Sequence, residues 1–448
     1  MTIQSKISEI WDRVESQGEL IPSMYADFDF SKVPERFTTA PDAVTQLAPK
    51  FAHRRPAILE NHERVEMIRA YTMMGDIVSD RYAALMREYG FRKLVEMLIE
   101  ACDKGVENVE GAPPELFAFI RDLERIPDWL DMELVEEGAR LDRAFGANVA
   151  SFVIRGAFIA TFMNKYSALP MAITNTLSSG TAANRVKETA TFFQTTTLPG
   201  ALRRFGAGFK AAAMVRLMHS MVRANVLRRP QDWDQSVYGI PIPQVDQMPA
   251  GLMPIFLMSN KIIAKGRNHF TRSERARVEM ARYRCFLLGL PEDLLADTPQ
   301  GVVDLMTTRH GTLRYDFDDS TCGELLRATM AADLRPDTSL RARIHGRFER
   351  AFSKIFFVQN FMHGDRRKAR NIGVDLTATD MLLSGLAAIF IVGRLGFYAA
   401  VSHLPGMQGV VDRIFVRRIE RQLEGYGRAH YTTDAANYRQ APAPVPAE

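Results

Sequence analysis

The sequence predicts an all-α protein, with a single large helical domain and additional peripheral helices. Apolar residues recur with the period of an α-helix through most of the chain, and no alternating strand pattern of convincing length interrupts them. Good helix formers such as Ala, Leu, Met, Glu and Arg dominate these segments. With 448 residues, 46% apolar and 25% charged, the chain can bury a sizeable core. One helical domain therefore suits it better than two.

Helices are predicted, in chain order, at residues 63–89, 91–105, 114–126, 132–163, 185–196, 209–228, 272–290, 302–307 and 341–360. Breaks are expected at proline dipeptides, namely Pro113-Pro114, Pro127-Asp128, Pro199-Gly200 and Arg229-Pro230. The proline-rich stretch 232–258 is expected to be irregular. We expect a helical N-terminal extension (1–110), the main domain (111–431) and a disordered Pro/Ala-rich tail (432–448).

One apolar run, residues 381–401, is about as long as a membrane span. Arg394 lies inside it, and Asp380 and His403 flank it. A central arginine costs roughly 2.5–3.5 kcal/mol on insertion scales. We therefore interpret the run as a buried core helix. Membrane insertion or peripheral membrane contact stays open as the alternative, because the basic stretch 366–370 lies nearby.

The charge and the cysteines exclude several classes of partner and site. A net charge of +4 is nearly balanced and lacks the dense basic surface that nucleic acid requires, so we expect no nucleic-acid partner. Cys102, Cys285 and Cys322 are far apart and contain no CxxC, which indicates reduced, buried thiols. The N-terminus shows no secretory or twin-arginine pattern. We expect a cytoplasmic protein.

Common catalytic motifs are absent from the sequence. It contains no Walker A, HExxH or GxSxG motif. None of its nine histidines follows a glutamate by three residues, which excludes the Glu-x-x-His half-sites of a di-iron bundle. Nucleotide binding, zinc proteolysis and serine hydrolysis therefore have no support.

The segment MVRLMHSMVRANV (214–226) places Arg216, His219 and Arg223 within an arc of roughly 60° on an otherwise apolar helix. A neutral imidazole can take an axial position of a haem, and arginines suit its propionates. The alternative is a core histidine between two arginines that solubilise the helix edge. Upstream, Arg185 and Thr189 share one helix face. The two helices could close around a ligand.

Five segments in the same order resemble the oxygenase MpaB and latex-clearing protein (rubber oxygenase) family, formerly a domain of unknown function. They are VRLMHSMVR, the R-x-x-x-T of Arg185 and Thr189, PDWLD, WDQSVYGIPIPQVDQM and YRCFLLGLPEDLLADTP. The resemblance implies a globin-like helical core around a b-type haem, with dioxygen as co-substrate. It implies that His219 is the proximal iron ligand. It also implies that Arg185, Thr189, Arg216 and Arg223 hold the haem and shape its pocket.

The chain departs from the rubber-cleaving members beside Thr189. Those proteins carry a lysine directly before the threonine, whereas here Glu188 takes that position and Lys187 lies about 100° round the helix. They also have an acidic residue upstream, but this chain has no carboxylate between Asp142 and Glu188. Glu188 and Lys187 are therefore the candidate catalytic residues, with Glu188 as the base. The alternative is that Glu188 only pairs with Arg185 at i+3.

These observations predict a haem b-dependent oxygenase of a small apolar compound, such as an isoprenoid, lipid or terpenoid. Dioxygen would attack an allylic or olefinic carbon in a pocket walled by Phe158, Phe162, Met163, Phe192 and Phe193. Core packing is the alternative role of these side chains. A non-catalytic haem or apolar-ligand binder of the same fold also stays open. Nothing in the sequence indicates the oligomeric state.

Overall fold

The structure, a computed structural model, describes residues 3–173, 182–334, 337 and 339–427. Within these residues every regular element is a helix, and the only β-structure consists of two isolated bridges, Phe37 with Leu313 and Thr45 with Arg314. The all-α prediction is confirmed. The predicted tail, 432–448, lies outside the described residues.

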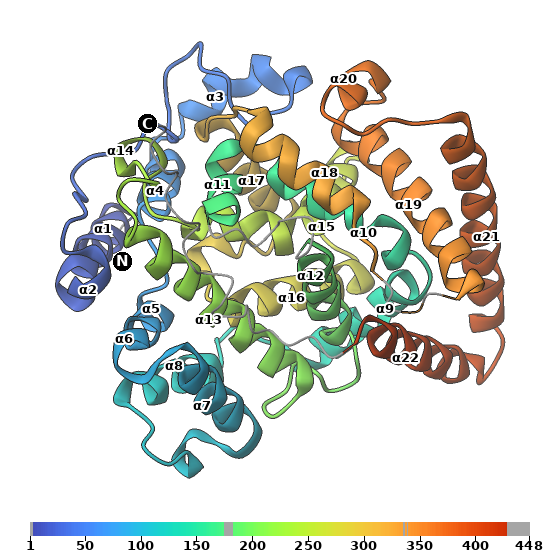
Figure 1. Ribbon diagram of the computed structural model, residues 1–448, viewed down its shortest axis with the longest axis horizontal. Coiled ribbons are helices and arrows are strands. Elements are labelled where there is room, and N and C mark those ends of the chain that lie inside the picture. The colour runs from blue at the N-terminus through green and yellow to red at the C-terminus, as the bar shows by residue number, and fades with distance from the viewer. Residues whose placement is uncertain (1–2, 174–181, 335–336, 338, 428–448) are drawn as a thin grey trace, which may run out of the picture.

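The N-terminal segment forms helices of four to eighteen residues on one side of the molecule (Figure 1). They are α1 (Ile3–Leu20), α2 (Pro22–Tyr25), α3 (Arg55–Leu59), α4 (His62–Thr72), α5 (Ile77–Ala84), α6 (Met86–Tyr89), α7 (Phe91–Lys104) and α8 (Pro114–Glu124), with 3-10 turns at Pro49–Arg54 and Val106–Asn108. The helix predicted at 63–89 is thus three helices. The second of these, α5, is capped by Asp76, whose side chain accepts a hydrogen bond from the Ser79 amide.

The central helices contribute to several apolar clusters, and they share the largest one with the N-terminal helices. The central helices are α9 (Met132–Asn148), α10 (Ala150–Ile159), α11 (Lys165–Ile173), α12 (Ala182–Thr195), α13 (Ala207–Leu227), α14 (Gln235–Tyr238), α15 (Gln244–Ala264), α16 (Arg272–Leu287), α17 (Pro299–Thr312) and α18 (Glu324–Ala331). Shorter turns occur at Ala160–Phe162, Glu292–Leu294 and Asp319–Gly323. Helix α13 packs against α5, α7 and α12, and α16 packs against α9.

Two boundary predictions in this region are wrong. The helix predicted at 132–163 bends by 94° between α9 and α10, so it is two helices. The stretch 232–258 is not irregular throughout, because α15 begins at Gln244 and contains Pro249 and Pro254. Burial of its apolar face in the largest cluster, with Met248 at 0% exposure, offsets the hydrogen bonds that the prolines remove.

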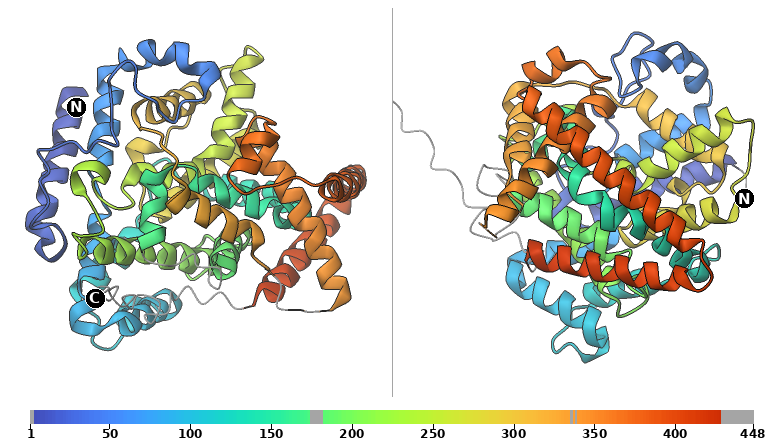
Figure 2. Two further views of the ribbon diagram at one scale, coloured as in Figure 1. Left: turned by 45° about the horizontal axis from the view of Figure 1, so that its top comes forward. Right: turned by 90° about the vertical axis from the view of Figure 1, so that its right-hand side faces the viewer.

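The last four helices form an outer layer, which we call the C-terminal layer (residues 340–427). It contains α19 (Leu340–Phe361), α20 (Arg366–Asn371), α21 (Ala378–Ser402) and α22 (Met407–Tyr426). Helix α19 packs against α10 on its inner side and against α21 on its outer side. Figure 2 shows α21 and α22 crossing the outer surface of the molecule.

The prediction that 381–401 is a buried core helix is wrong. In α21 only Ser384, Ala387 and Ile391 are buried, since the helix has neighbours along one side alone. It is also long and apolar enough to cross a membrane, with 17% of its most apolar window buried. The cysteine prediction, by contrast, is confirmed. Cys102, Cys285 and Cys322 are free and buried, and burial raises the pKa of each thiol to about 12.

Candidate functional site

The candidate site lies where α12 packs against α13. Helix α13 is buried on almost every side, which is why its sequence shows a weak polar face. Arg216 and Arg223 are buried and His219 is partly buried. Three charged or titratable groups on one buried helix must find partners from other elements, because an isolated buried charge is strongly destabilising.

The imidazole of His219 stands at the end of a hydrogen-bond relay. Its Nδ1 lies 3.2 Å from Oε1 of Gln247 on α15. Nε2 of Gln247 donates to Oε1 of Gln244 (3.1 Å), and Nε2 of Gln244 donates to the carbonyl of Gly75 (2.9 Å). A backbone carbonyl only accepts, so the relay is directional and Nδ1 is the nitrogen that carries the proton. The tautomer fixed in this way leaves a lone pair on Nε2.

Burial keeps His219 neutral. It lowers the pKa of the imidazole from its ordinary 6.5 to about 4, with the charges of Arg223 and Arg185 acting in the same direction. The hydrogen bond to Gln247 and the charge of Asp76 oppose this shift. Among the described residues, Nε2 has no hydrogen-bond partner. A neutral imidazole with its other N–H held by an acceptor is the form in which histidine binds a metal.

Arg216, one turn before His219, is paired with two carboxylates. Its Nε and Nη2 donate to Asp76 (2.5 and 2.9 Å), and its Nη1 lies 2.7 Å from Asp122. Burial alone would lower the pKa of Arg216, but the two carboxylates raise it above its ordinary value. Gly289, at φ +88°, lies against this pair, and a Cβ there would overlap both the carboxylate and the guanidinium.

Arg223, one turn after His219, is fully buried and forms an ion pair with Asp80. The hydroxyl of Tyr25 donates to the same carboxylate (2.6 Å). Arg223 also donates to the carbonyls of Pro241 (2.9 Å) and Ile242 (2.6 Å). Although burial opposes it, the Asp80 carboxylate raises the pKa of Arg223, so the guanidinium stays charged.

The turn that presents these carbonyls is strained. Ile242 has φ +49°, in the left-handed region that β-branched residues rarely adopt. Its carbonyl points to the buried guanidinium of Arg223, and this charge-assisted hydrogen bond offsets the cost of the conformation. The strain therefore lies directly beside the histidine helix.

Both arginines thus have acceptors from the protein itself. The carboxylates come from the start and first turn of α5 and from α8, so they tie α13 to the N-terminal segment. In this arrangement Arg216 and Arg223 position the helix that carries His219. That either of them binds a propionate stays a prediction.

Helix α12 presents the remaining candidates. Nη1 of Arg185 lies 3.1 Å from Oε2 of Glu188, and each side chain is 17% exposed. The ion pair that the sequence left open as an alternative is therefore present. Arg185 lies close enough to His219 for its charge to lower the pKa of the imidazole. Thr189 and Lys187 are partly buried on the same helix. That Glu188 or Lys187 takes part in catalysis stays a prediction.

The five candidate wall residues do not form one surface. Phe192 and Phe193 pack in the largest cluster with the residues of α13. Phe158 and Phe162 make an edge-to-face contact, with ring centroids 4.9 Å apart, in a second cluster that includes the other side of α12. Met163 belongs to a third cluster. Phe192 and Phe193 are therefore the wall candidates that share a cluster with the histidine helix.

Sequence reasoning missed the acceptors of the site. Asp76 and Asp80 stand four residues apart in the otherwise apolar MGDIVSD, which is an unusual place for two acids and was the available signal. Gln247 lies within one of the five family-like segments but has no pattern of its own. The predicted extension, 1–110, therefore supplies part of the site.

Comparisons with known proteins identify one family and one similar solved structure. Residues 143–357 match the family described as ER-bound oxygenase mpaB/B'/Rubber oxygenase, catalytic domain. No curated protein sequence matches the chain. A solved structure of the latex clearing protein LCP in the closed state is similar, with a TM-score of 0.54 and 16% sequence identity. The similarity covers 78% of this chain and 91% of that one. At this identity the likeness concerns the fold, an all-α single domain.

Proposed function

Residues 143–357 belong to the MpaB/rubber oxygenase catalytic domain family, and from this premise we propose that the chain is a haem b-dependent oxygenase of an apolar isoprenoid, lipid or terpenoid-like compound. The family is one of oxygenases. The cofactor, the substrate class and the residue roles are part of the proposal. The observation that carries it is the relay from Gly75 to His219, which leaves Nε2 as a free nitrogen donor.

The residues present fit a haem. His219 supplies a neutral nitrogen ligand whose Nδ1–H is held by Gln247, the support that iron-bound histidines generally have. Arg185, on the neighbouring helix, is a cation near the imidazole and suits a propionate. Arg216 and Arg223 fix α13 through Asp76 and Asp80, so the imidazole does not rotate away. These residues would hold the group.

When bound, haem supplies activation of dioxygen for attack on an olefinic or allylic carbon. The chain supplies the surroundings of the reaction. Phe192 and Phe193 offer apolar surface beside α13 and exclude water from it. Glu188 is the one carboxylate on α12, and it can accept a proton at Oε2 when the contact with Arg185 opens. If that contact stays closed, Glu188 only orders Arg185.

An absorbance spectrum of the purified chain after addition of haem tests the cofactor. We expect a Soret band that His219→Ala abolishes. The matched control is His310→Ala, because His310 is also a partly buried imidazole whose pKa burial lowers, to about 3, but it lies on α17 against Phe256. A wild-type chain that takes up no haem, or a Soret band that survives His219→Ala unchanged, would overturn the proposal.

A second candidate is a non-catalytic haem or apolar-ligand binder of the same fold. The Arg185–Glu188 ion pair favours it, since it occupies the one carboxylate of α12. Oxygen uptake by the reduced, haem-loaded protein with polyisoprenoid, terpenoid and fatty-acyl compounds separates the two. Cleavage of a C=C bond by O2 into a pair of carbonyl groups balances without another reductant, so carbonyl formation must follow oxygen uptake. Oxygen binding without turnover of any compound would favour the binder.

We also propose that the chain acts in the cytoplasm, without a nucleic-acid partner. Three free, buried cysteines suit a reducing compartment, and a net charge of +4 on 448 residues is too small for a general affinity for nucleic acid. Fractionation of cells that express the chain, combined with a nucleic-acid retention assay, tests both statements.

A further inference from the structure

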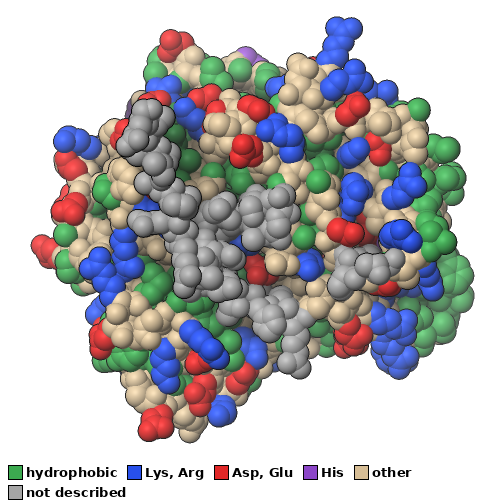
Figure 3. All heavy atoms as spheres, in the orientation of Figure 1, with side chains coloured by type: hydrophobic (Ala, Val, Ile, Leu, Met, Phe, Trp, Pro, Cys, Tyr) green, Lys and Arg blue, Asp and Glu red, His purple; other side chains and the backbone are tan. Residues whose placement is uncertain are grey.

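Helix α21 turns an apolar face to solvent. Every exposed side chain from Met381 to Ala400 is apolar, and the other exposed positions are glycines. Ile389 is 73% exposed and Val392 67%. The other large exposed side chains are Met381, Leu382, Leu386, Phe390 and Phe397. Figure 3 shows these hydrophobic side chains gathered along the edge of the molecule that α21 forms. A continuous apolar face of this kind marks a site of interaction.

The one charge within the apolar run lies at the edge of this face, in a groove that Phe390 and Phe397 also line. Arg394 turns inward, where its Nη2 donates to Oδ1 of Asn148 (2.8 Å) and its guanidinium lies 4.8 Å from the centre of the Phe390 ring. The arginine that argues against membrane contact in the sequence therefore leaves the exposed face of the helix uncharged.

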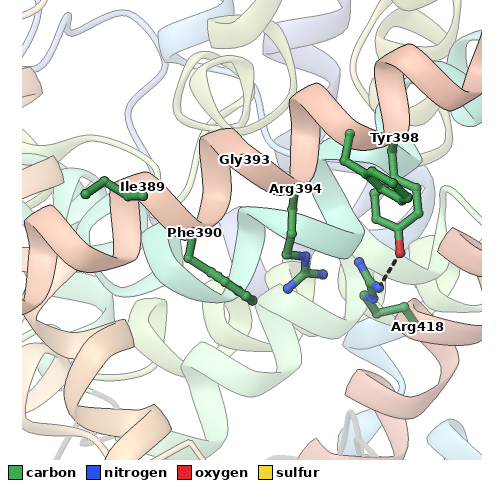
Figure 4. Close-up of a pocket in the computed structure, with 7 residues that line it drawn as sticks. Ile389, Phe390, Gly393, Arg394, Tyr398 and Arg418 are labelled. Atoms are coloured by element: carbon green, nitrogen blue, oxygen red, sulfur yellow. Dashed lines mark hydrogen bonds between the residues drawn. The ribbon is translucent and has the colours of Figure 1, made fainter.

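Beside the apolar face, Arg394 and Arg418 form a pair of cations in a shallow groove between α21 and α22 (Figure 4). Nη1 of Arg418 donates to Oδ1 of Asn148 (2.6 Å), the atom that Arg394 also uses, and its Nη2 donates to the hydroxyl of Tyr398 (3.0 Å). Among the described residues, no carboxylate forms an ion pair with either guanidinium. Two guanidinium groups that share one neutral acceptor suit a phosphate.

Positive charge is concentrated in the same layer. Residues 340–427 contain 14 Lys and Arg and 7 Asp and Glu, a net charge of +7. The whole chain carries +4, so the other residues together carry −3. The layer that exposes the apolar face is therefore the basic part of an otherwise slightly acidic protein, which is complementary to an anionic surface.

We propose that the C-terminal layer docks on an anionic phospholipid bilayer. Helix α21 lies in the plane of the interface, with its apolar face among the acyl chains and a lipid phosphate held by Arg394 and Arg418. It does not span the bilayer. Helix α19 packs along it and carries Arg341, Arg343 and Arg347, which a spanning arrangement would take into the hydrocarbon.

The other occupants of this face fit less well. A second copy meeting the same face by two-fold symmetry would bring two layers of charge +7 together. The C-terminal segment 428–448 contains no Leu, Ile, Met, Phe or Trp, so it has few side chains with which to cover an apolar surface. An anionic bilayer supplies both the apolar volume and the negative charge.

Co-sedimentation of the full chain with phosphatidylglycerol/phosphatidylcholine vesicles tests the apolar face. We expect binding that Ile389→Ser with Val392→Ser weakens by roughly tenfold for each side chain. Ile126→Ser is the matched control, since Ile126 is 77% exposed outside this layer, and it should change nothing. Circular dichroism checks that each variant is folded. Equal binding by the double variant and the wild type would overturn the proposal.

A second pair of variants tests the phosphate contact. Arg394→Gln with Arg418→Gln should weaken binding to the anionic vesicles by roughly fivefold for each arginine. The change should weaken binding to pure phosphatidylcholine less, because that headgroup has a phosphate but no net charge. Arg92→Gln is the control, since Arg92 is an exposed arginine on α7, outside this layer. Equal wild-type binding to both kinds of vesicle would overturn the proposal. So would a dimer in sedimentation equilibrium that the Ile389 and Val392 changes dissociate, with no vesicle binding. Haem is absent from these assays, so the outcome is independent of the proposed oxygenase activity.

Discussion

The histidine helix and the C-terminal layer reverse the usual places of charged and apolar side chains in opposite ways. Around α13, Arg216 and Arg223 are buried, yet each is compensated by a carboxylate of the same chain. In α21, large apolar side chains such as Ile389 are exposed, and no described residue covers them. A buried charge that is neutralised by a carboxylate of the same chain indicates a site built by the fold. An apolar face that no part of the chain covers indicates a partner outside the protein.

The largest expected effect is on stability, at the compensated charges. Asp80→Ala leaves Arg223 buried without its carboxylate, and removal of one partner of a buried pair costs roughly 3–5 kcal/mol. Urea denaturation followed by circular dichroism measures the loss. Glu96→Ala, at the solvent-exposed Arg92–Glu96 pair, is the control and should leave the midpoint unchanged. A loss below about 1 kcal/mol for Asp80→Ala would mean that α13 is held by packing alone.

Acid should loosen the same region. The pKa of His219 is about 4 in the folded chain and 6.5 as its ordinary value, so the unfolded chain binds more protons between these pH values. The contribution of His219 is fully present above pH 6.5 and is lost as the pH falls to 4, by up to about 3 kcal/mol. His219→Gln, which cannot titrate, should flatten this part of the stability profile. An unchanged slope contradicts the burial of the imidazole.

The hydrogen-bond relay to His219 should contribute less to the free energy of unfolding than to the affinity for haem. Gln247→Leu removes the acceptor of the Nδ1 proton, and loss of such a support typically weakens metal binding by roughly 10–100-fold. A haem titration measures the affinity, and resonance Raman spectroscopy of the reduced protein reports the iron–histidine bond. Gln247→Glu keeps an acceptor, and because a carboxylate accepts the Nδ1 proton more strongly than an amide, the iron–histidine frequency should reach or exceed that of the wild type. If both variants behave alike, the side chain only fills space.

The smallest effect on the free energy of unfolding is expected at the exposed apolar face of α21. Without vesicles, Ile389→Ser should change the free energy of unfolding by no more than about 0.5 kcal/mol, because the side chain is already in water. Ile391→Ala, two residues along but 4% exposed, should cost about 2–5 kcal/mol. Urea midpoints measure both. A large loss for Ile389→Ser would show that the face is covered by this chain.

The histidine site was predictable in part. The helical period places Arg216, His219 and Arg223 on one arc, and spacing alone indicated the Arg185–Glu188 contact that α12 shows. The partners of the arginines were not predictable. Asp76 and Arg216 are 140 residues apart, and periodicity says which face of a helix is polar but not which distant residue meets it.

The errors in the fold have physical causes of the same kind. The 94° bend occurs at Val149, where the sequence has no glycine or proline. We infer that the helices packed around this point impose the change of direction. The prolines of α15 are tolerated since the burial of Met248 and its neighbours outweighs two lost hydrogen bonds. The apolar composition of α21 led to the prediction of a buried helix, because hydropathy does not distinguish a covered side from an exposed one. The positions of α19 and α22 decide which side of α21 is covered.

The ion pair of Asp80 with Arg223 also has a consequence for folding during synthesis. The two residues are separated by 143 positions, so the acid leaves the ribosome well before its arginine has been made. At typical rates of elongation the interval is roughly seven to thirty seconds. During that time α5 and α8 have apolar surface and acids but no α13 to receive them. Nascent chains halted before α13 should therefore be held by chaperones, and chains that include it should be released.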